Sequence, residues 1–357
     1  MIPVTKPFLP DKSEYQRYVD VIWDNQWVTN NGPLVKEFES LLGKKLQMTA
    51  PQLVSNGTIA LQMAIKVLEI NGDIITTPFS YVATTSSIKW EGCEPVFADI
   101  DQKTLNINPE LIEGLINERT AGILATHCFG NACDIDRIDA IGKKYGIPVI
   151  YDAAHCFGTL YKGKSIFNYG DLSVCSLHAT KLMHSIEGGL MFSNNNELKE
   201  KIASYRNFGH EGYENFRGLG TNGKNSEFHA AMGLCVLEHF SSILAKRISQ
   251  CEIYDGLLEG LSIARPSVDE NCLSNRAYYP IIFETQEKCL KAKSSLEKQG
   301  VFGRRYFYPS LSSLPYVKKQ NTPVADDIAS CILCLPLYDT LEYDEQKMIC
   351  DVLLNTE

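Results

Sequence analysis

Two residues of this chain, Asp152 and Lys181, have side-chain types and positions that could carry out chemistry on a bound ligand. Asp152 follows the apolar, β-branched run 146–150, which predicts a buried strand. A carboxylate at the carboxyl end of such a strand lies where open α/β sheets bind their ligands. Lys181 lies in a turn of small polar residues after a second predicted strand at 172–177. A lysine amine becomes nucleophilic when desolvation or a neighbouring cation lowers its pKa, and it can then form a Schiff base.

These two residues form the pair that pyridoxal phosphate requires, namely a carboxylate for its pyridinium nitrogen and a lysine for the Schiff base. Each residue also has an ordinary structural interpretation. A lone lysine between polar residues is usually a solvated surface charge, and an aspartate after a strand is often a helix N-cap. The functional interpretation gains weight because further pieces of such a site occur in order along the chain.

A candidate phosphate site lies in the segment 52–61, where a predicted short strand, a polar turn and an apolar helix follow one another. Gly57 permits a tight turn, and Thr58 opens a helix whose first N–H groups and dipole attract an anion. The alternative is a plain strand-to-helix turn, since Ser-Asn and Asn-Gly turns are common. Tyr81, after the predicted strand 73–78, could stack on a flat cofactor ring or serve as a core aromatic.

Strands and helices alternate from about residue 50 to 195, which predicts an α/β fold with a mostly parallel sheet covered on both faces. A helix is expected at 109–117, between two of the strands. A long helix beginning near 226 leads into a smaller α+β region. We therefore expect a large domain at 1–245, which includes an N-terminal arm, and a small C-terminal domain at 246–357.

The length and composition of the chain fit a globular protein of two or three domains. It has 357 residues, of which 44% are hydrophobic and 22% charged. The net charge of −9, without a basic run, argues against DNA or RNA as the main partner. Neither a signal peptide nor an apolar run of membrane length is apparent, so we expect a cytoplasmic protein. Its 12 cysteines then predict reduced, mostly buried thiols, and the Cys331/Cys334 spacing predicts packing rather than a metal site.

Five segments taken in order resemble the DegT/DnrJ/EryC1/StrS group of pyridoxal-phosphate sugar aminotransferases. They are residues 27–33, 55–58, 151–155, 176–181 with 187–189, and 220–227. Each segment alone is weak, but together they are highly specific, and the resemblance spans nearly the whole chain. It implies the aspartate-aminotransferase fold, fold type I, with a mostly parallel seven-stranded sheet and a smaller α+β C-terminal domain.

The resemblance implies that Lys181 is the catalytic residue, which holds pyridoxal phosphate covalently and moves a proton between the substrate carbon and the cofactor. Asp152 would pair with the protonated ring nitrogen and so keep the ring an electron sink. Gly57 and Thr58 would bind the phosphate through backbone N–H groups, and Ser176 would add its hydroxyl.

Three further residues would complete this cofactor site. Tyr81 would stack on the ring, and His155 would lie beside the ring hydroxyl. Asn222 would reach the phosphate from the neighbouring subunit, so that a homodimer would share the site. The chain has Gly223 and Lys224 where the family often has tyrosine and arginine, so this loop could bind differently across the dimer.

The implied reaction moves an amino group from L-glutamate to a nucleotide-linked keto sugar, as in the biosynthesis of deoxyaminosugars such as those of O-antigens. Residues 3–10 and 27–33 are similar to those of enzymes that aminate C4, which favours dTDP-4-dehydro-6-deoxyglucose as the acceptor. Amination at C3 of a dTDP-3-keto-6-deoxyhexose remains an alternative. Amination of a GDP- or UDP-linked 4-keto sugar is another. A basic, aromatic cluster could meet the diphosphate and the base, or could be a solvated turn; it comprises Arg304, Arg305, Tyr306 and Tyr308.

Two rival functions remain open at this point. Family members that dehydrate a deoxysugar at C3 carry a histidine in place of the lysine, and the presence of Lys181 argues against that chemistry. A non-enzymatic regulator could bind the cofactor or the sugar as a sensor, although an intact pair of Asp152 and Lys181 favours an enzyme.

Overall fold

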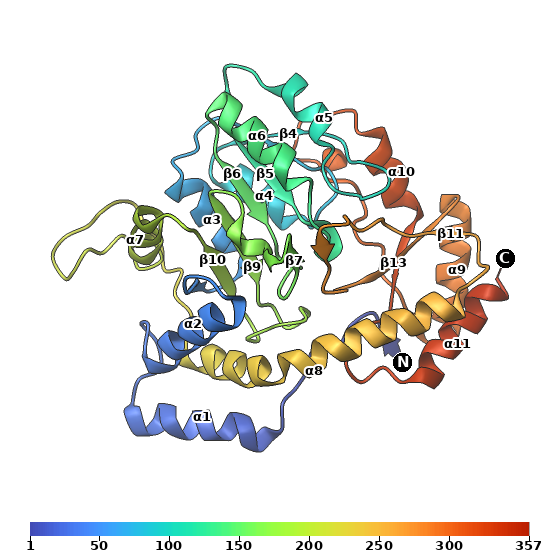
Figure 1. The fold of residues 1–357 in the computed structure, drawn as a ribbon, viewed down its shortest axis with the longest axis horizontal. Coiled ribbons are helices and arrows are strands. Elements are labelled where there is room, and N and C mark those ends of the chain that lie inside the picture. Colours follow the sequence, from blue (N-terminus) through green and yellow to red (C-terminus); the bar gives the residue numbers. More distant parts are fainter. Residues whose placement is uncertain (357) are drawn as a thin grey trace.

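The computed structural model describes residues 1–356, and a seven-stranded sheet forms its centre (Figure 1). Five neighbouring strands of this sheet run parallel, and β10 runs antiparallel to both of its neighbours. The strands, in spatial order, are β2 (Gln52–Val54), β10 (Gly189–Phe192), β9 (Leu172–Ser176), β6 (Val149–Asp152), β5 (Thr120–Thr126), β3 (Asp73–Thr76) and β4 (Glu94–Phe97). The predicted α/β class with a mostly parallel sheet is therefore confirmed.

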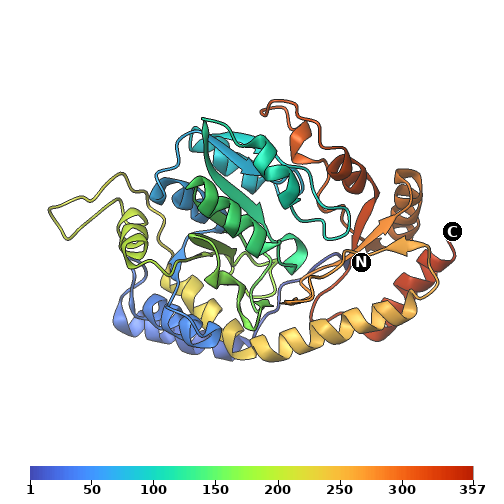
Figure 2. The ribbon, with the colours of Figure 1, turned by 45° about the horizontal axis from the view of Figure 1, so that its top comes forward.

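Helices cover both faces of this sheet, and strand residues alternate between the two cores (Figures 1 and 2). One core packs under α3 (Gly57–Val67), α4 (Ala83–Trp90) and α7 (Asn196–Tyr205). The other packs under α2 (Pro33–Leu46), α6 (Ile135–Tyr145) and α8 (Glu227–Leu257). In β6, Tyr151 belongs to the second core and Ile150 to the first. The two-residue period therefore directs Asp152 towards the α3 and α4 face.

The helix expected at 109–117 is shorter in the structure. It consists of α5 (Pro109–Ile112), followed by a 3₁₀ turn at Glu113–Leu115. Gly114 lies in this run, and glycine weakens a helix by about 1 kcal/mol relative to alanine. Of the residues in the helix and the turn, Ile112 is the buried one, so little packing supports a longer helix.

The C-terminal region forms a smaller α+β unit around a three-stranded antiparallel sheet. Its strands are β11 (Ile263–Ala264), β13 (Tyr279–Phe283) and β15 (Ile332–Leu335), and its helices are α9 (Gln286–Lys298), α10 (Pro323–Cys331) and α11 (Tyr343–Leu354). The first residues of the chain join this unit, because β1 (Ile2–Pro3) pairs with β14 (Val301–Phe302). A further small sheet of β7 (Leu160–Tyr161), β8 (Lys164–Ser165) and β12 (Cys272–Leu273) ties the two regions together.

The long helix α8 connects the two regions without a break (Figure 1). Its residue Ile243 packs in a core of the large region, and Cys251 packs in the core of the C-terminal unit. The proposed division at residue 245 therefore lies inside one continuous helix. Among residues 1–356, α8 is the one helix long and apolar enough to cross a membrane, but 50% of its apolar window is buried. It packs against α1 (Lys12–Asn25), α2 and α11, as a core helix does.

Candidate active site

A cavity of about 540 Å³ lies at the carboxyl ends of the parallel strands, between the large sheet and the C-terminal unit. The last residues of three strands line it, namely Thr126 of β5, Asp152 of β6 and Ser176 of β9. Nine predicted site residues line this cavity, and they are Gly57, Thr58, Tyr81, Asp152, His155, Ser176, Lys181, Arg304 and Tyr306. Asn222 and Tyr308 are not among its lining residues.

Asp152 is a buried carboxylate with two hydrogen-bond donors from the protein. Its Oδ2 accepts from the Thr84 hydroxyl at 2.8 Å, and its Oδ1 accepts from the Ala154 N–H at 3.2 Å. Burial raises the pKa of Asp152, while the bonds from Thr84 and Ala154 and the charge of Lys181 lower it. A buried carboxylate of this kind is suited to pair with a cation that enters the cavity.

Lys181 lies in a turn that the backbone holds closely, because its N–H donates to the carbonyl of His178 at 2.8 Å. Its amine lies 3.4 Å from the hydroxyl of Tyr278, which belongs to the C-terminal unit. Desolvation lowers the pKa of this amine, and the nearby Tyr306 and Asp152 oppose that shift. A partly desolvated amine in a cavity is suited to act as a nucleophile and as a base.

The start of α3 forms an anion-binding corner of the cavity. The Asn56 side chain caps this helix by accepting from the Ile59 N–H at 2.8 Å. The first N–H groups of a helix have no partner within it, so those of Gly57 and Thr58 are available to an anion. A Cβ on Gly57 would lie 3.1 Å from the Ser176 Cβ, so glycine lets the Ser176 side chain approach the helix start.

Gly189 also shapes this corner of the cavity. A Cβ on Gly189 would lie 2.5 Å from the Asn56 carbonyl oxygen and 3.0 Å from the Gly57 nitrogen. Only glycine therefore lets β10 begin directly against the turn that precedes α3. This contact gives a physical reason for two sequence motifs that are far apart in the chain.

His155 is buried between two aromatic rings that line the same cavity. Its ring stacks on Phe307 at 5.8 Å between centroids and meets the edge of Tyr278 at 4.9 Å. Burial holds the pKa of His155 well below its ordinary value, so the imidazole is neutral. Its buried Nδ1 has no hydrogen-bond partner within residues 1–356. Because a buried polar atom is normally paired, this nitrogen fits a ligand with a polar ring substituent.

The predicted basic, aromatic cluster divides into two parts. The Arg304 guanidinium lies 4.5 Å from the centroid of the Tyr306 ring, and both residues line the cavity. Arg305 instead donates to the Ser330 carbonyl at 2.8 Å and lies over the Tyr308 ring at 3.6 Å. Tyr308 is 51% exposed, so Arg304 and Tyr306 are the members of the cluster placed to meet a ligand in the cavity.

The segment 206–226, between α7 and α8, extends from the body of the protein (Figure 1). Asn222 belongs to this segment and is exposed. Its backbone forms an isolated β-bridge with Asn207, and the neighbouring Lys224 donates to the Asn207 side chain at 2.8 Å. Asn222 does not reach the cavity of its own chain.

Sequence reasoning missed three residues of this site, namely Thr84, Tyr278 and Phe307. Thr84 lies beside Thr85, which is equally buried, and no sequence pattern distinguishes the two. Tyr278 meets Lys181 across 97 positions of the chain, so only the fold brings them together. Tyr278 directly precedes β13, and no sequence pattern gives the direction of its side chain.

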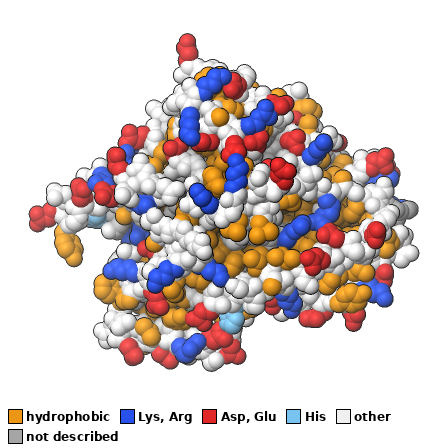
Figure 3. Space-filling model, viewed as in Figure 1, with side chains coloured by type: hydrophobic (Ala, Val, Ile, Leu, Met, Phe, Trp, Pro, Cys, Tyr) orange, Lys and Arg blue, Asp and Glu red, His pale blue; other side chains and the backbone are white. Residues whose placement is uncertain are grey.

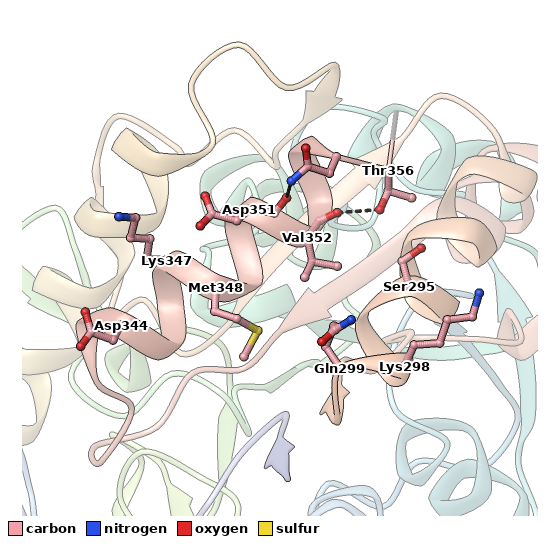
Figure 4. A pocket seen from close by; sticks show the side chains of 10 residues that line it. Ser295, Lys298, Gln299, Asp344, Lys347, Met348, Asp351, Val352 and Thr356 are labelled. Carbon is pink, nitrogen blue, oxygen red and sulfur yellow. Dashed lines mark hydrogen bonds between the residues drawn. The ribbon is translucent and has the colours of Figure 1, made fainter.

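A second hollow of about 600 Å³ lies between α9 and α11 (Figure 4). Residues of these two helices and the adjoining ends line it, among them Lys298, Asp344, Lys347 and Asp351. No strand end of the large sheet contributes to this hollow. Within residues 1–356, no group of three or more His, Cys, Asp or Glu side chains could hold a metal ion. The cavity at the strand ends is therefore the candidate active site.

The charges on the surface are mixed. On the face drawn in Figure 3, acidic and basic side chains alternate, and no extended basic stripe crosses it. All 12 cysteines are unbonded, and all are buried except Cys272, which is partly exposed.

Comparisons with known proteins give a consistent result. A family model described as the DegT/DnrJ/EryC1/StrS aminotransferase family matches residues 10–354. The chain is 42% identical to a dTDP-4-amino-4,6-dideoxy-D-glucose transaminase of Shigella dysenteriae, over 96% of this chain and 95% of that protein. It is 36% identical to a protein of the same name from Escherichia coli, over 99% and 98% of the two chains.

A solved structure also matches over nearly the whole chain. It is that of DesI in the presence of its TDP-sugar product, with a TM-score of 0.94 and 28% sequence identity. The match covers 99% of this chain and 92% of that chain. The arrangement of sheet, long helix and C-terminal unit is therefore one that a sugar-processing protein also uses.

Proposed function

Because this chain belongs to the DegT/DnrJ/EryC1/StrS aminotransferase family and is a sugar aminotransferase, we propose that its cavity binds pyridoxal phosphate and aminates a nucleotide-linked keto-deoxysugar. The amino donor is L-glutamate, and the acceptor is dTDP-4-dehydro-6-deoxy-D-glucose, which gives dTDP-4-amino-4,6-dideoxy-D-glucose. The observation that carries the proposal is the convergence of Asp152, Lys181 and the start of α3 on one cavity. Two relatives named for this product, at 42% and 36% identity, support the choice of sugar.

The residues of the cavity suit the cofactor. Asp152 would accept a hydrogen bond from the protonated ring nitrogen, and the N–H groups of Gly57 and Thr58 with the Ser176 hydroxyl would hold the phosphate. When bound, pyridoxal phosphate supplies an electron sink that stabilises negative charge on the carbon that loses a proton. The unpaired Nδ1 of His155 would meet a polar substituent of the ring.

Tyr81 would pack on the face of the ring. Its side chain is 51% exposed and lines the cavity, so a flat ligand would cover apolar surface that is now open. Aromatic rings prefer offset stacked or edge-on contacts, worth about 0.5–1.5 kcal/mol beyond area burial. This packing would also keep water from that side of the reacting carbon.

Lys181 would hold the cofactor covalently and would move a proton. Its amine is held near the Tyr278 hydroxyl at 3.4 Å, which limits the directions it can take. A lowered pKa leaves more of the amine neutral near pH 7, and a neutral amine can accept a proton from the substrate carbon. The same amine, once protonated, can return the proton.

Arg304 would bind the anionic groups of the two substrates in turn. Its guanidinium lines the cavity, where it could meet the glutamate carboxylate or the sugar-nucleotide diphosphate. Tyr306, beneath the guanidinium, would hold it in place. Tyr308 lies outside the cavity, so its predicted role would be limited to the part of the nucleotide that extends beyond it.

We further propose that two copies of the chain form a homodimer with shared sites. Large apolar side chains are exposed on α1 and in the loop that carries Asn222, and they include Trp23, Phe208, Phe216 and Leu219. Exposed apolar surface of this extent is typical of a contact with another protein. A partner's Asn222 would then complete the phosphate site that the chain's own Asn222 does not reach.

The acceptor is tested by incubating the protein with L-glutamate and dTDP-4-dehydro-6-deoxyglucose and identifying the product by NMR. The proposal predicts an amino group on C4. Turnover with a dTDP-3-keto sugar, or with a GDP- or UDP-linked sugar, and none with this acceptor would overturn the choice of substrate.

A further inference from the structure

Three buried hydroxyl groups connect in a line to the carboxylate of Asp152. The Thr126 Oγ1 donates to the Ser80 Oγ at 3.1 Å, and the Ser80 Oγ lies 2.8 Å from the Thr84 Oγ1. The Thr84 Oγ1 in turn donates to the Asp152 Oδ2 at 2.8 Å. The four side chains are buried, with relative exposures of 2% for Thr126, 2% for Ser80, 0% for Thr84 and 5% for Asp152. We call Thr126, Ser80 and Thr84 the hydroxyl chain.

The hydroxyl chain is assembled from separate elements of the fold. Thr126 is the last residue of β5, Ser80 follows β3, and Thr84 lies in the first turn of α4. Asp152 is the last residue of β6, which neighbours β5 in the sheet. The line of hydrogen bonds is therefore a product of the sheet's topology and is not a local turn.

The directions of these bonds follow from the number of hydrogens available. Each hydroxyl has one hydrogen to donate, and an ionised carboxylate can only accept. Thr84 donates its hydrogen to Asp152, so the bond between Ser80 and Thr84 must be donated by Ser80. Thr126 then donates to Ser80. All three hydrogens point towards the carboxylate, and bonds aligned in this way polarise and strengthen one another.

We propose that the hydroxyl chain keeps the carboxylate of Asp152 ionised and fixed in orientation, so that it can pair with a positively charged ring nitrogen in the cavity. The inference rests on the proposed role of Asp152 as the partner of the cofactor ring. Thr84, Ser80 and Thr126 are in this view positioning residues, which act through Asp152.

Besides Thr84, several other groups lie near Asp152, and of these only the Ala154 N–H keeps the carboxylate ionised regardless of its own protonation state. The groups concerned are the Ala154 N–H, the Lys181 amine and the thiols of Cys128, Cys133, Cys156 and Cys175. Burial raises the pKa of every one of these thiols, so they are neutral at physiological pH. Lys181 offers charge only while it is protonated, and desolvation lowers its pKa. The Thr84 hydroxyl and the Ala154 N–H act on Asp152 in every state of Lys181.

The test compares full-length Thr84→Val with wild type, each loaded with pyridoxal phosphate that carries ¹⁵N in the ring. Valine keeps the shape of threonine and removes the donor. Loss of a hydrogen bond to a charged group destabilises the carboxylate, so the ring nitrogen should lose its proton more readily. The ¹⁵N shift followed over pH should show the nitrogen titrating about 1–2 pH units lower. Affinity for the cofactor should fall about 10- to 100-fold.

Three further variants separate this role from simple packing. Thr85→Val is the matched control, because Thr85 is equally buried and its hydroxyl has no partner within residues 1–356. It should titrate as wild type does, and Thr84→Ser should restore the wild-type titration. Ser80→Ala leaves Thr84 and Asp152 in place and should shift the ring nitrogen in the same direction by less. This variant decides the matter if Thr84→Val retains no cofactor.

An unchanged ring-nitrogen titration in Thr84→Val and Ser80→Ala would overturn the inference, and so would equal shifts in Thr84→Val and Thr85→Val. A cofactor-free measurement separates this inference from the proposed function. The full-length protein is labelled with ¹³C-aspartate, and the Asp152 signal is assigned through Asp152→Asn. In Thr84→Val, the pH midpoint at which the Asp152 carboxyl titrates should rise by about 1–2 pH units. Failure of wild type to take up pyridoxal phosphate would refute the proposed function, whereas an unshifted Asp152 would refute the hydroxyl chain.

Discussion

The amine of Lys181 lies 3.4 Å from the hydroxyl of Tyr278, although the two residues are 97 positions apart and belong to different regions of the fold. Lys181 follows the large sheet, and Tyr278 directly precedes β13 of the C-terminal unit. The Tyr278 ring also makes edge-type contacts with His155 and Tyr306, with ring centroids 4.9 Å and 5.4 Å apart. The cavity is thus closed by contacts between the two regions, so their packing directly affects the position of the proposed catalytic amine.

Replacing Tyr278 with phenylalanine should therefore slow the reaction without emptying the site. The ring contacts remain, while the hydroxyl near Lys181 is lost. A neutral hydrogen bond contributes about 0.5–1.5 kcal/mol, so kcat should fall about 2- to 10-fold, with little change in KM for glutamate. Tyr279→Phe serves as the control, because that hydroxyl donates to Asp255 at 2.7 Å outside the cavity. A loss of kcat of equal size in both variants would contradict a role for Tyr278 at the amine.

Replacing Gly57 with alanine should weaken cofactor binding. The added Cβ would lie 3.1 Å from the Ser176 Cβ, which would push the serine away from the start of α3. Loss of one hydrogen bond to the phosphate should reduce affinity about 10- to 100-fold, measured by titrating cofactor-free protein with pyridoxal phosphate. Gly114→Ala is the control, since a Cβ there meets nothing within 4 Å, and its affinity should equal that of wild type. Unchanged affinity in Gly57→Ala would argue against this corner as the phosphate site.

Replacing Arg304 with methionine should raise KM for glutamate and for the sugar nucleotide, by about 10- to 100-fold for a lost charge-assisted pair. The adjacent Arg305 provides the control, because its guanidinium faces away and donates to the Ser330 carbonyl at 2.8 Å. Arg305→Met should lower thermal stability and leave KM near the wild-type value. Steady-state kinetics for the two variants test whether Arg304 is the substrate-binding arginine. A larger rise in KM for Arg305→Met than for Arg304→Met would assign that role to Arg305 instead.

Replacing Asp152 with asparagine should stabilise the cofactor-free protein at neutral pH while impairing cofactor binding. The pKa of Asp152 is raised in the folded state, so the folded protein binds more protons than the unfolded chain above the ordinary pKa of 3.8. The contribution of this carboxyl to stability is therefore greatest below that pH and declines as pH rises through the folded pKa. Asparagine carries no charge to desolvate, so Tm should rise near pH 7.

Thermal unfolding over a range of pH checks this prediction for Asp152. The gain in Tm should shrink as the pH falls through the pKa of Asp152 in the folded protein, because the wild-type carboxyl then takes up a proton and no longer carries a buried charge. A gain that is constant over pH would point to a packing effect, and a lower Tm for Asp152→Asn at neutral pH would contradict the account. Lower affinity of the same variant for pyridoxal phosphate would show that Asp152 serves function at a cost in stability.

The parts of this site that sequence reasoning could predict are those with local signals. Asp152 follows an apolar β-branched run, and Gly57 lies at a strand-to-helix turn. The sequence pattern therefore predicted that both residues lie at the ends of strands of the sheet. The mostly parallel sheet followed from the alternation of strands and helices, and the structure confirms it. Lys181 had a weaker signal, since its surroundings are a turn whose path the sequence does not specify.

The parts that could not be predicted depend on directions and on distant contacts. Arg304 and Arg305 are neighbours, yet one lines the cavity and the other packs near α10, because the local path of the backbone turns them apart. Thr84 and Thr85 differ only in the face of α4 on which they lie. The helix expected at 109–117 was too long, because α5 ends at Ile112. The division into two domains at residue 245 stays a prediction, and α8 runs through that point without a break.

The central claim is that Lys181 holds pyridoxal phosphate in this cavity, and one labelling experiment tests it most directly. Purified protein loaded with the cofactor is reduced with borohydride, digested, and analysed by mass spectrometry. The account predicts a yellow protein whose visible absorbance is lost on reduction, with the cofactor bonded to Lys181 and a Lys181→Ala variant that carries none. A colourless protein that takes up no pyridoxal phosphate, or a cofactor bonded to another lysine such as Lys224, would contradict it.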